Sequence, residues 1–338
     1  MDHGLRHGSA VRQMDFLFQT HTYLMTLGKA HMSQKYTFRL GGYGPASTSF
    51  SQGLDYIGGK LEAAYGDDVD VKYIYNIMDI GYRADEIITL VEEGFLTLGY
   101  QSSSYLTSRV PELGFVDLPF LFSDNLSARA AIDGELGTYL SRKTEDRINY
   151  KILGYFENGF RHISNKLRPI HAPEDMTNMK IRVLPSDVQA QTFQLLGADP
   201  KILDLTEAIA GVTDGSLDAQ ENPFANTVTY GVHKFHRFHT MSNHFYISRS
   251  IFANRTAYYS WPEELKQFMA QTVSEAIAIQ RGQAEQEAIE SQQAIQAEGC
   301  EINELTPDEL DAFTAAVKPQ HDEARAVYGD AMFKMIGR

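Results

Sequence analysis

The fold is decided at residues 36–45, which read Tyr36-Thr37-Phe38-Arg39-Leu40-Gly41-Gly42-Tyr43-Gly44-Pro45. The first five side chains alternate in polarity, which predicts a strand, and the glycines and proline that follow predict a turn. The chain beyond this turn predicts a helix over 48–65, a strand over 69–75, a helix over 84–92 and a strand over 95–100. Alternating strands and helices indicate an α/β fold, in which ligands bind at the carboxyl ends of the strands.

The same pattern starts again later in the chain. A strand is predicted over 152–156, a short strand over 180–183 and a helix over 187–196. A length of 338 residues also corresponds to roughly two domains at about 150 residues each. We therefore predict two α/β lobes.

A single long helix is predicted over 262–298, because this segment has no proline after Pro262, one glycine at Gly282, and many Ala, Gln and Glu residues. At 1.5 Å per residue it would be about 55 Å long, which exceeds one small domain. We expect it to span both lobes. The expected organisation is an amino-terminal extension or degraded leader (1–34), a first lobe (35–158, with a return segment at about 246–262), a second lobe (159–245), the long helix (262–298) and a carboxyl-terminal helical segment (299–338).

The amino end contains only part of a secretory leader. Arg6 and Arg12 precede an apolar stretch, but Gln19 and His21 interrupt it, and a leader needs an unbroken apolar run of about 7–15 residues. Three interpretations stay open: a degraded or mis-started leader, a tag-like extension, and a cytosolic amino end.

Composition excludes several classes of function. With 30 Lys and Arg against 44 Asp and Glu, the formal charge is −14, which opposes binding to nucleic acids and anionic lipid surfaces. Hydrophobic residues make up 43% and charged residues 22%, as in soluble globular proteins. Cys300 is the single cysteine, so an internal disulfide and a cysteine-rich metal site are excluded.

Two short motifs invite cofactor hypotheses. Gly42-x-Gly44-x-x-Ser47 follows a strand, but it lacks the third glycine of a dinucleotide fingerprint, so an ordinary turn is the better interpretation. His233, His236 and His239 are spaced by three and invite a zinc hypothesis. Lys234 and Arg237 lie between them, and we expect a cationic, partly exposed loop near a lobe boundary, with no metal and no cofactor.

Two arginines are more informative. Arg161 follows Glu157-Asn158-Gly159-Phe160, and Arg182 lies inside the apolar pair of Ile181 and Val183. An arginine at the mouth of a cleft can present a planar fork to a carboxylate and form two parallel charge-assisted hydrogen bonds. An ordinary surface ion pair is the alternative, and spacing alone leaves both open.

Several linked stretches together resemble a known family. They are Val116-Asp117-Leu118-Pro119-Phe120-Leu121-Phe122, Phe156-Glu157-Asn158-Gly159-Phe160-Arg161, Arg168-Pro169-Ile170 with Pro173-Glu174-Asp175-Met176, Met179-Lys180-Ile181-Arg182-Val183, Leu196-Gly197-Ala198-Asp199-Pro200 and 214–223, which ends in Gln220-Glu221-Asn222-Pro223. In order and spacing the chain resembles the substrate-binding proteins of tripartite ATP-independent periplasmic (TRAP) transporters, of the DctP type, from about Tyr36 to the last helix.

The resemblance implies a two-lobed, periplasmic-binding-protein-like fold with a hinge, and a set of ligand-binding residues. Arg182 takes the position that binds the ligand carboxylate, and Arg161 takes a position that assists this binding. Asn222 takes the position that forms a hydrogen bond with the ligand from the hinge side. The opposing wall is expected around Tyr43, Gln101 and Tyr105, with Phe224 near the pocket.

Some residues depart from the family pattern. Phe156 stands where tryptophan is frequent, Leu205 where an aromatic residue can stack on the ligand, and Asp79-Ile80-Gly81 replaces a frequent Gln-Leu-Gly. These departures bear on which substrate is bound.

The function implied is that of a periplasmic, monomeric receptor without catalytic residues. It would capture a small organic acid by its carboxylate and deliver it to the small and large subunits of a TRAP membrane permease. Two alternatives stay open: a two-lobed enzyme acting on a small carboxylate, with Glu157 or a histidine as acid–base group, and a soluble sensory relative of the same fold.

Overall fold

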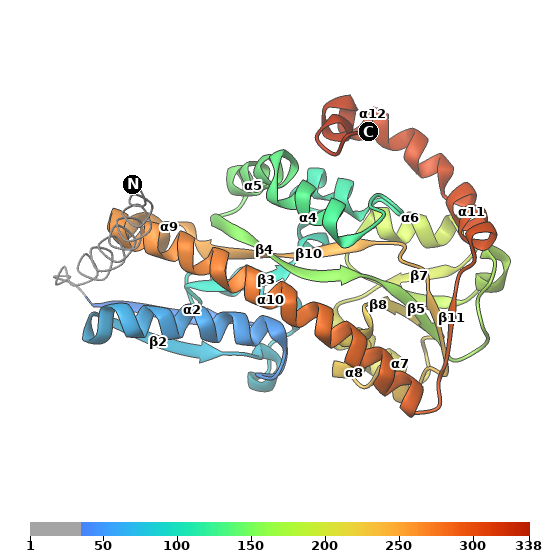
Figure 1. Cartoon of the computed structure of the whole chain (residues 1–338), viewed down its shortest axis with the longest axis horizontal. Helices are drawn as coiled ribbons and strands as arrows, with labels where there is room; N and C mark the ends of the chain where they lie inside the picture. The colour runs from blue at the N-terminus through green and yellow to red at the C-terminus, as the bar shows by residue number, and fades with distance from the viewer. Residues whose placement is uncertain (1–34) are drawn as a thin grey trace, which may run out of the picture.

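The computed structural model describes residues 35–338, so the expectations for residues 1–34 lie outside the described residues. Figure 1 shows two sheets, helices packed around each of them, and one long helix that runs diagonally across both. No helix in the described part of the chain has the length and apolar character needed to cross a membrane.

The first sheet has five strands in the order β2-β1-β3-β10-β4. Strand β1 pairs in parallel with β2 and β3, and β10 pairs antiparallel with β3 and β4. The strands are β1 (Tyr36–Gly41), β2 (Val69–Ile74), β3 (Leu98–Ser102), β4 (Tyr150–Phe160) and β10 (Tyr246–Asn254). The strand predicted over 95–100 is displaced, because it begins at Leu98 and continues to Ser102.

The second sheet has six strands in the order β11-β9-β5-β8-β6-β7. They are β5 (His162–Asn165), β6 (Lys180–Val183), β7 (Asp199–Ile202), β8 (Ala219–Asn222), β9 (Phe238–Met241) and β11 (Glu301–Glu304). Strand β11 pairs in parallel with β9. The carboxyl-terminal segment is therefore not wholly helical as expected, because its first residues complete an edge of this sheet.

The helices surround both sheets in Figure 1. They are α2 (Ser49–Tyr65), α3 (Ile87–Glu92), α4 (Asn125–Asp133), α5 (Glu135–Arg147), α6 (Asp187–Leu195), α7 (Leu205–Thr213), α8 (Phe224–Thr229), α9 (Arg255–Ser260), α10 (Glu263–Ala297), α11 (Pro307–Ala316) and α12 (Lys318–Lys334). The α/β class with two lobes is confirmed.

Helix α10 contains 35 residues and begins directly after Pro262, as predicted. It packs against α2 and β4 in the first lobe and against α8 in the second. At 1.5 Å per residue it is about 53 Å long. The long helix spanning both lobes is confirmed.

Two chain segments cross between the sheets next to each other. The chain passes from β4 to β5 at Arg161, and it returns from β9 to β10 through residues 242–245. The backbone N–H of Arg161 donates to the carbonyl of Phe245 at 2.9 Å, which joins the two crossings. A pair of short, neighbouring crossings is the geometry expected of a hinge.

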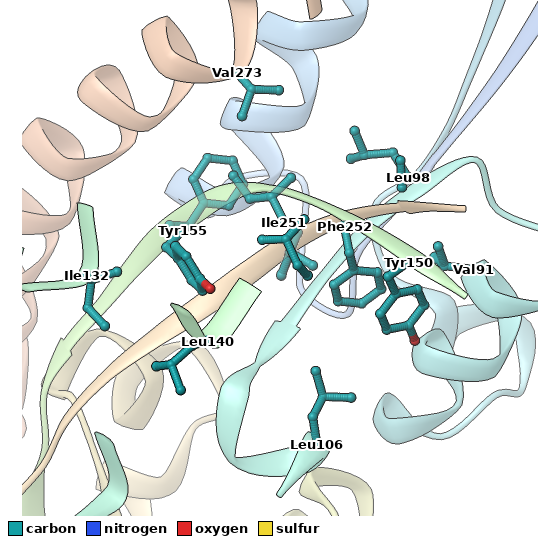
Figure 2. Packing of buried hydrophobic residues seen from close by; sticks show 14 of the residues in the cluster. Val91, Leu98, Leu106, Ile132, Leu140, Tyr150, Tyr155, Ile251, Phe252 and Val273 are labelled. Atoms are coloured by element: carbon teal, nitrogen blue, oxygen red, sulfur yellow. The ribbon is translucent and has the colours of Figure 1, made fainter. Parts of the chain in front are cut away.

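The core of the first lobe lies on both sides of β4 and β10. Figure 2 shows Val273 of α10 on one side of these strands and Leu140 of α5 on the other. The rings of Tyr150 and Phe252 stack with their centroids 4.3 Å apart. These side chains are buried, and the burial of such apolar surface is the main stabilising term for the lobe.

Helix α2 lies very close to β4 at one glycine. A Cβ atom added at Gly53 would lie 2.6 Å from Cζ of Phe156, which is too close for real atoms. At Gly59 in the same helix, an added Cβ would meet nothing within 4 Å. Gly53 therefore permits the close packing of α2 on the ring of Phe156, whereas Gly59 has no such role.

Candidate ligand-binding site

A small cavity lies between the two lobes. Its lining from the first lobe comes from the ends of β1 and β3 and from β4 and β10, and its lining from the second lobe comes from β6, β8, α7 and α8. The lining residues are Tyr43, Ser102, Tyr105, Asn158, Arg161, Arg182, Leu184, Leu205, Asn222, Asn226, Tyr230 and Arg249. The carboxyl ends of strands β1, β3, β6 and β8 thus meet at this cavity, where α/β sheets bind ligands.

Five of the seven residues predicted to bind ligand line this cavity: Tyr43, Tyr105, Arg161, Arg182 and Asn222. The other two lie elsewhere. The side chain of Gln101 is buried, donates to the carbonyl of Ala84 at 2.9 Å and accepts from the backbone N–H of Ser102 at 2.8 Å. Phe224 packs on the ring of His162, with centroids 4.4 Å apart, and lines a neighbouring cavity. Gln101 is therefore not part of the opposing wall as expected, whereas Phe224 lies near the interlobe cavity without lining it.

Arg182 is 1% exposed and is held at two points. Its Nε donates to the carbonyl of Leu203 at 3.0 Å, and its Nη2 donates to the hydroxyl of Tyr105 at 3.1 Å. Within residues 35–338, no carboxylate forms an ion pair with it. Burying an unpaired charge is costly, so a buried arginine without a counterion is the most unusual side chain of this cavity.

The hydroxyl of Tyr105 is also placed to donate. Its oxygen accepts from Arg182 and, at 3.2 Å, from the backbone N–H of Leu205. Both lone pairs are then in use, so its own proton is left for another acceptor. Burial raises the pKa of Tyr105 above its usual range, which keeps this phenol protonated at neutral pH.

Arg161, in contrast, already has its partner. Its Nη2 donates to Oε1 of Glu221 at 2.8 Å and to the Glu221 carbonyl at 2.6 Å, and its Nε bonds the other carboxylate oxygen. Both side chains are fully buried. Burial acts to raise the pKa of Glu221, but the charge of Arg161 and the nearby His244 outweigh it, and the pKa is lowered. The carboxylate therefore stays ionised and neutralises Arg161.

Arg249 is a functional candidate that the sequence analysis missed. It lies on β10 with 3% exposure, and its guanidinium carbon is 3.7 Å from the ring centroid of Phe50 and 4.8 Å from that of Tyr43. Its Nε has no hydrogen-bond partner. Burial acts to lower the pKa of Arg249, but neighbouring phenols, Tyr43 first among them, outweigh it and raise the pKa. The available signal was an arginine in a strand with Ile247 and Ile251 two residues away on either side.

Three asparagine side chains connect the lobes at the cavity. Nδ2 of Asn226 donates to Oδ1 of Asn158 at 3.2 Å and to Oδ1 of Asn222 at 3.3 Å. Nδ2 of Asn222 donates to Oε1 of Gln220 at 2.9 Å. Because one amide hydrogen of Asn222 is not used in these bonds, it can donate to a bound molecule from the second lobe.

The three histidines of the motif are buried, although Lys234 and Arg237 between them are exposed. His236 and His239 are 1% and 0% exposed, and His233 is 9% exposed. Burial lowers the pKa of His236 to about 3 and that of His239 to about 4, so both are neutral at physiological pH. No group of three potential ligands lies close enough to hold a metal ion in the described part of the chain. His239 lies on β9, whereas His233 and His236 lie in the segment before it. The expected partly exposed, cationic segment therefore holds for Lys234 and Arg237 but not for the histidines.

Glu157, the acid–base group of the enzyme alternative, is engaged elsewhere. Its oxygens accept from Nε and Nη2 of Arg129, each at 2.6 Å, and from the hydroxyl of Tyr246 at 2.7 Å. It is buried and does not line the interlobe cavity. This placement gives it a structural ion pair rather than access to a substrate in that cavity.

Comparison with known proteins agrees with the fold. A family model described as "Bacterial extracellular solute-binding protein, family 7" (DctP) matches residues 46–326. A solute-binding protein of Verminephrobacter eiseniae is 25% identical over 285 residues, covering 84% of this chain and 83% of that protein.

Two solved structures superpose on most of the chain. A TRAP periplasmic solute-binding protein of Sulfurospirillum deleyianum with bound succinate has a TM-score of 0.82 and 27% identity, and covers 90% of this chain and 98% of its own. A sugar-acid-binding protein of Advenella mimigardefordensis in complex with galactonate shares the fold, with a TM-score of 0.84, 23% identity and coverage of 90% and 97%. The chain therefore belongs to the DctP family of extracellular solute-binding proteins of TRAP transporters, which are binding proteins rather than enzymes.

Proposed function

We propose that this protein captures a small organic acid between its lobes, with Arg182 as the anchor for the ligand carboxylate. The observation that carries the proposal is the buried Arg182 guanidinium, which has no ion-pair partner within residues 35–338 and lines the interlobe cavity. Tyr105 and Asn222 offer further hydrogen-bond donors beside it. The similar protein from Sulfurospirillum deleyianum holds succinate, and that from Advenella mimigardefordensis holds galactonate, both of which are carboxylates.

The test is a thermal-shift screen of organic acids, followed by calorimetry on the compounds that raise the melting temperature. A ligand that binds only the folded state stabilises it in proportion to ln(1 + [L]/Kd). We expect Arg182→Met to weaken binding by roughly 10²- to 10⁴-fold, because the ligand charge loses a desolvated partner. Arg142→Met is the matched control, since Arg142 is exposed on α5. Equal affinities for Arg182→Met and the parent protein would refute the anchor.

We further propose that the protein works outside the cytoplasm and passes its ligand to a TRAP membrane permease. Membership of an extracellular solute-binding family supports this proposal. In the native host, release of the protein by osmotic shock is the expected result, together with loss of uptake of the same acid when the gene is deleted. Retention with the cytosolic fraction would instead favour a soluble sensory relative.

A further inference from the structure

The charges at the interlobe cavity do not balance. Its lining contains Arg161, Arg182 and Arg249 and no aspartate or glutamate. Glu221 neutralises Arg161. Neither Arg182 nor Arg249 has an ion-pair partner within the described residues. Two buried positive charges are therefore left over.

Nearby carboxylates do not remove this imbalance. Asp204 follows Leu203, whose carbonyl accepts from Arg182, but its own oxygens accept from the backbone N–H groups of Thr206 at 2.9 Å and Asp85 at 3.1 Å. It caps α7 and forms no ion pair with Arg182. Its position partly offsets the local potential, yet the hydrogen bonds of the Arg182 guanidinium go to Leu203 and Tyr105 and not to its carboxylate.

The aromatic rings around Arg249 stabilise its charge, and Tyr230 shares a side-chain hydrogen bond with it, but its Nε is left without a partner. The guanidinium lies over Phe50, Tyr43 and Tyr100, at 3.7, 4.8 and 5.7 Å from their centroids. Cation–π attraction acts on the face of the guanidinium plane, whereas its N–H groups point within that plane and need acceptors. The unpartnered Nε confirms that the protein leaves at least one donor unsatisfied.

The two arginines also come from different lobes. Arg182 lies on β6 of the second sheet, and Arg249 lies on β10 of the first, and both line the same cavity. A ligand held between the lobes therefore meets a buried positive charge on each side. A single carboxylate bound to Arg182 would leave Arg249 buried and unpaired in the closed site.

We propose that the ligand is a small dianion, a dicarboxylate, whose second carboxylate is bound by Arg249 in the first lobe. This inference rests on the proposed function and adds the substrate class and a specificity-determining residue. Arg182 binds one carboxylate of the ligand in the second lobe. Arg249 binds the other carboxylate and so distinguishes a dianion from a monoanion.

The test compares acids that differ in one charge. The probes are succinate with its monoamide succinamate, glutarate with glutaramate, and galactarate with galactonate. We expect at least one diacid to bind the parent protein roughly 100-fold or more tightly than its monoanionic counterpart, because the latter leaves Arg249 without a counterion. Calorimetry gives both affinities directly.

The same pair is then measured on two variants of residue 249. In Arg249→Met, which keeps an apolar chain among the rings, the preference for the diacid should fall below about fivefold, while the monoanion binds as before within about threefold. In Arg249→Lys, which keeps the charge, most of the preference should remain. The unliganded Arg249→Met variant should melt no lower than the parent protein, because an unmatched buried charge has been removed.

The outcomes separate this inference from the function on which it rests. If monoanionic acids bind as tightly as diacids, or if the preference survives Arg249→Met, the dianion inference is overturned while acid capture stands. If no acid of either charge binds, both proposals fail. Should Arg249→Met not fold, the comparison of diacid and monoanion on the parent protein still decides the substrate class.

Discussion

The hydroxyl of Tyr105 accepts a hydrogen bond from Nη2 of Arg182 at 3.1 Å, and these two residues belong to different lobes. The same oxygen accepts from the backbone N–H of Leu205, again in the second lobe. One phenol in the first lobe therefore makes two contacts with the opposite wall of the binding cavity. The contact between Tyr105 and Arg182, the proposed anchor, therefore forms only when the lobes are close together.

Tyr105→Phe tests this contact. The change removes one hydroxyl and leaves the ring, so Arg182 and Leu205 each lose a buried acceptor. We expect affinity for an organic acid to fall by roughly tenfold, in line with one or two hydrogen bonds of about 1 kcal/mol each. Calorimetry on the variant and on Arg182→Met compares the two losses. A larger loss for Tyr105→Phe than for Arg182→Met would show that the tyrosine, not the arginine, is the anchor.

Glu221→Gln tests the neutralisation of Arg161. The substitution leaves Arg161 as a buried charge without its carboxylate, and we expect the free energy of unfolding to fall by about 3–5 kcal/mol. Urea unfolding measures the loss. The double variant Arg161→Met with Glu221→Gln removes both charges and should recover a large part of it. No recovery in the double variant would show that packing, rather than charge, dominates at this pair.

Asp117 makes stability depend on pH in a direction that can be checked. This buried side chain accepts from the hydroxyl of Ser104 at 2.7 Å, and burial raises its pKa from 3.8 to about 6. Above pH 6 the carboxyl is ionised in both states, and the folded state bears the desolvation cost. Between about pH 6 and pH 4 the folded state takes up a proton that the unfolded state does not, so its contribution to stability rises as pH falls.

Asp117→Asn isolates that contribution. The asparagine cannot ionise, so the free energy of unfolding of the parent minus that of the variant should increase by on the order of 3 kcal/mol between pH 7.5 and pH 4. Chemical unfolding at several pH values gives the difference. A difference that stays constant over this range would show that Asp117 titrates near its ordinary value.

Gly53→Ala tests the close packing of α2 on Phe156. The added methyl group would lie 2.6 Å from Cζ of the ring, so either the helix or the ring must move. We expect a loss of about 1–3 kcal/mol in the free energy of unfolding, as for other overpacked cores. Gly59→Ala in the same helix meets nothing within 4 Å and should instead gain about 0.5–1 kcal/mol. Similar effects at both positions would contradict the packing explanation.

The local sequence pattern was sufficient to predict the strands and helices whose residues follow a regular periodicity. The alternation at 36–40 predicted β1, and the proline-free segment after Pro262 predicted α10, because both signals are contained within the element itself. Arg182 was recognisable because a charged residue between Ile181 and Val183 has no ordinary place in an apolar strand. Its lack of an ion-pair partner could not be predicted, since that depends on the residues of other strands.

The errors have the same physical origin. Gln101 precedes Ser102, which does line the cavity, and neighbouring residues of a strand point to opposite faces. The pairing of Arg161 with Glu221 depends on the register of β5 with β8, in which Ile163 lies opposite Glu221. Arg249 lies on β10, which joins the first sheet after the chain has completed much of the second. Contacts between residues that are far apart in the sequence cannot be predicted from the pattern of neighbouring residues.

The continuity of α10 limits how the protein can open. This continuous helix packs against α2 and β4 in the first lobe and against α8 in the second. Any motion that separates the two sheets must therefore bend α10 or break its contacts with one of the two lobes. Gly282, which has no neighbouring atom within 4 Å of an added Cβ, is a place where bending meets little steric resistance. The elastic cost of bending α10 therefore adds to the free energy needed to separate the lobes.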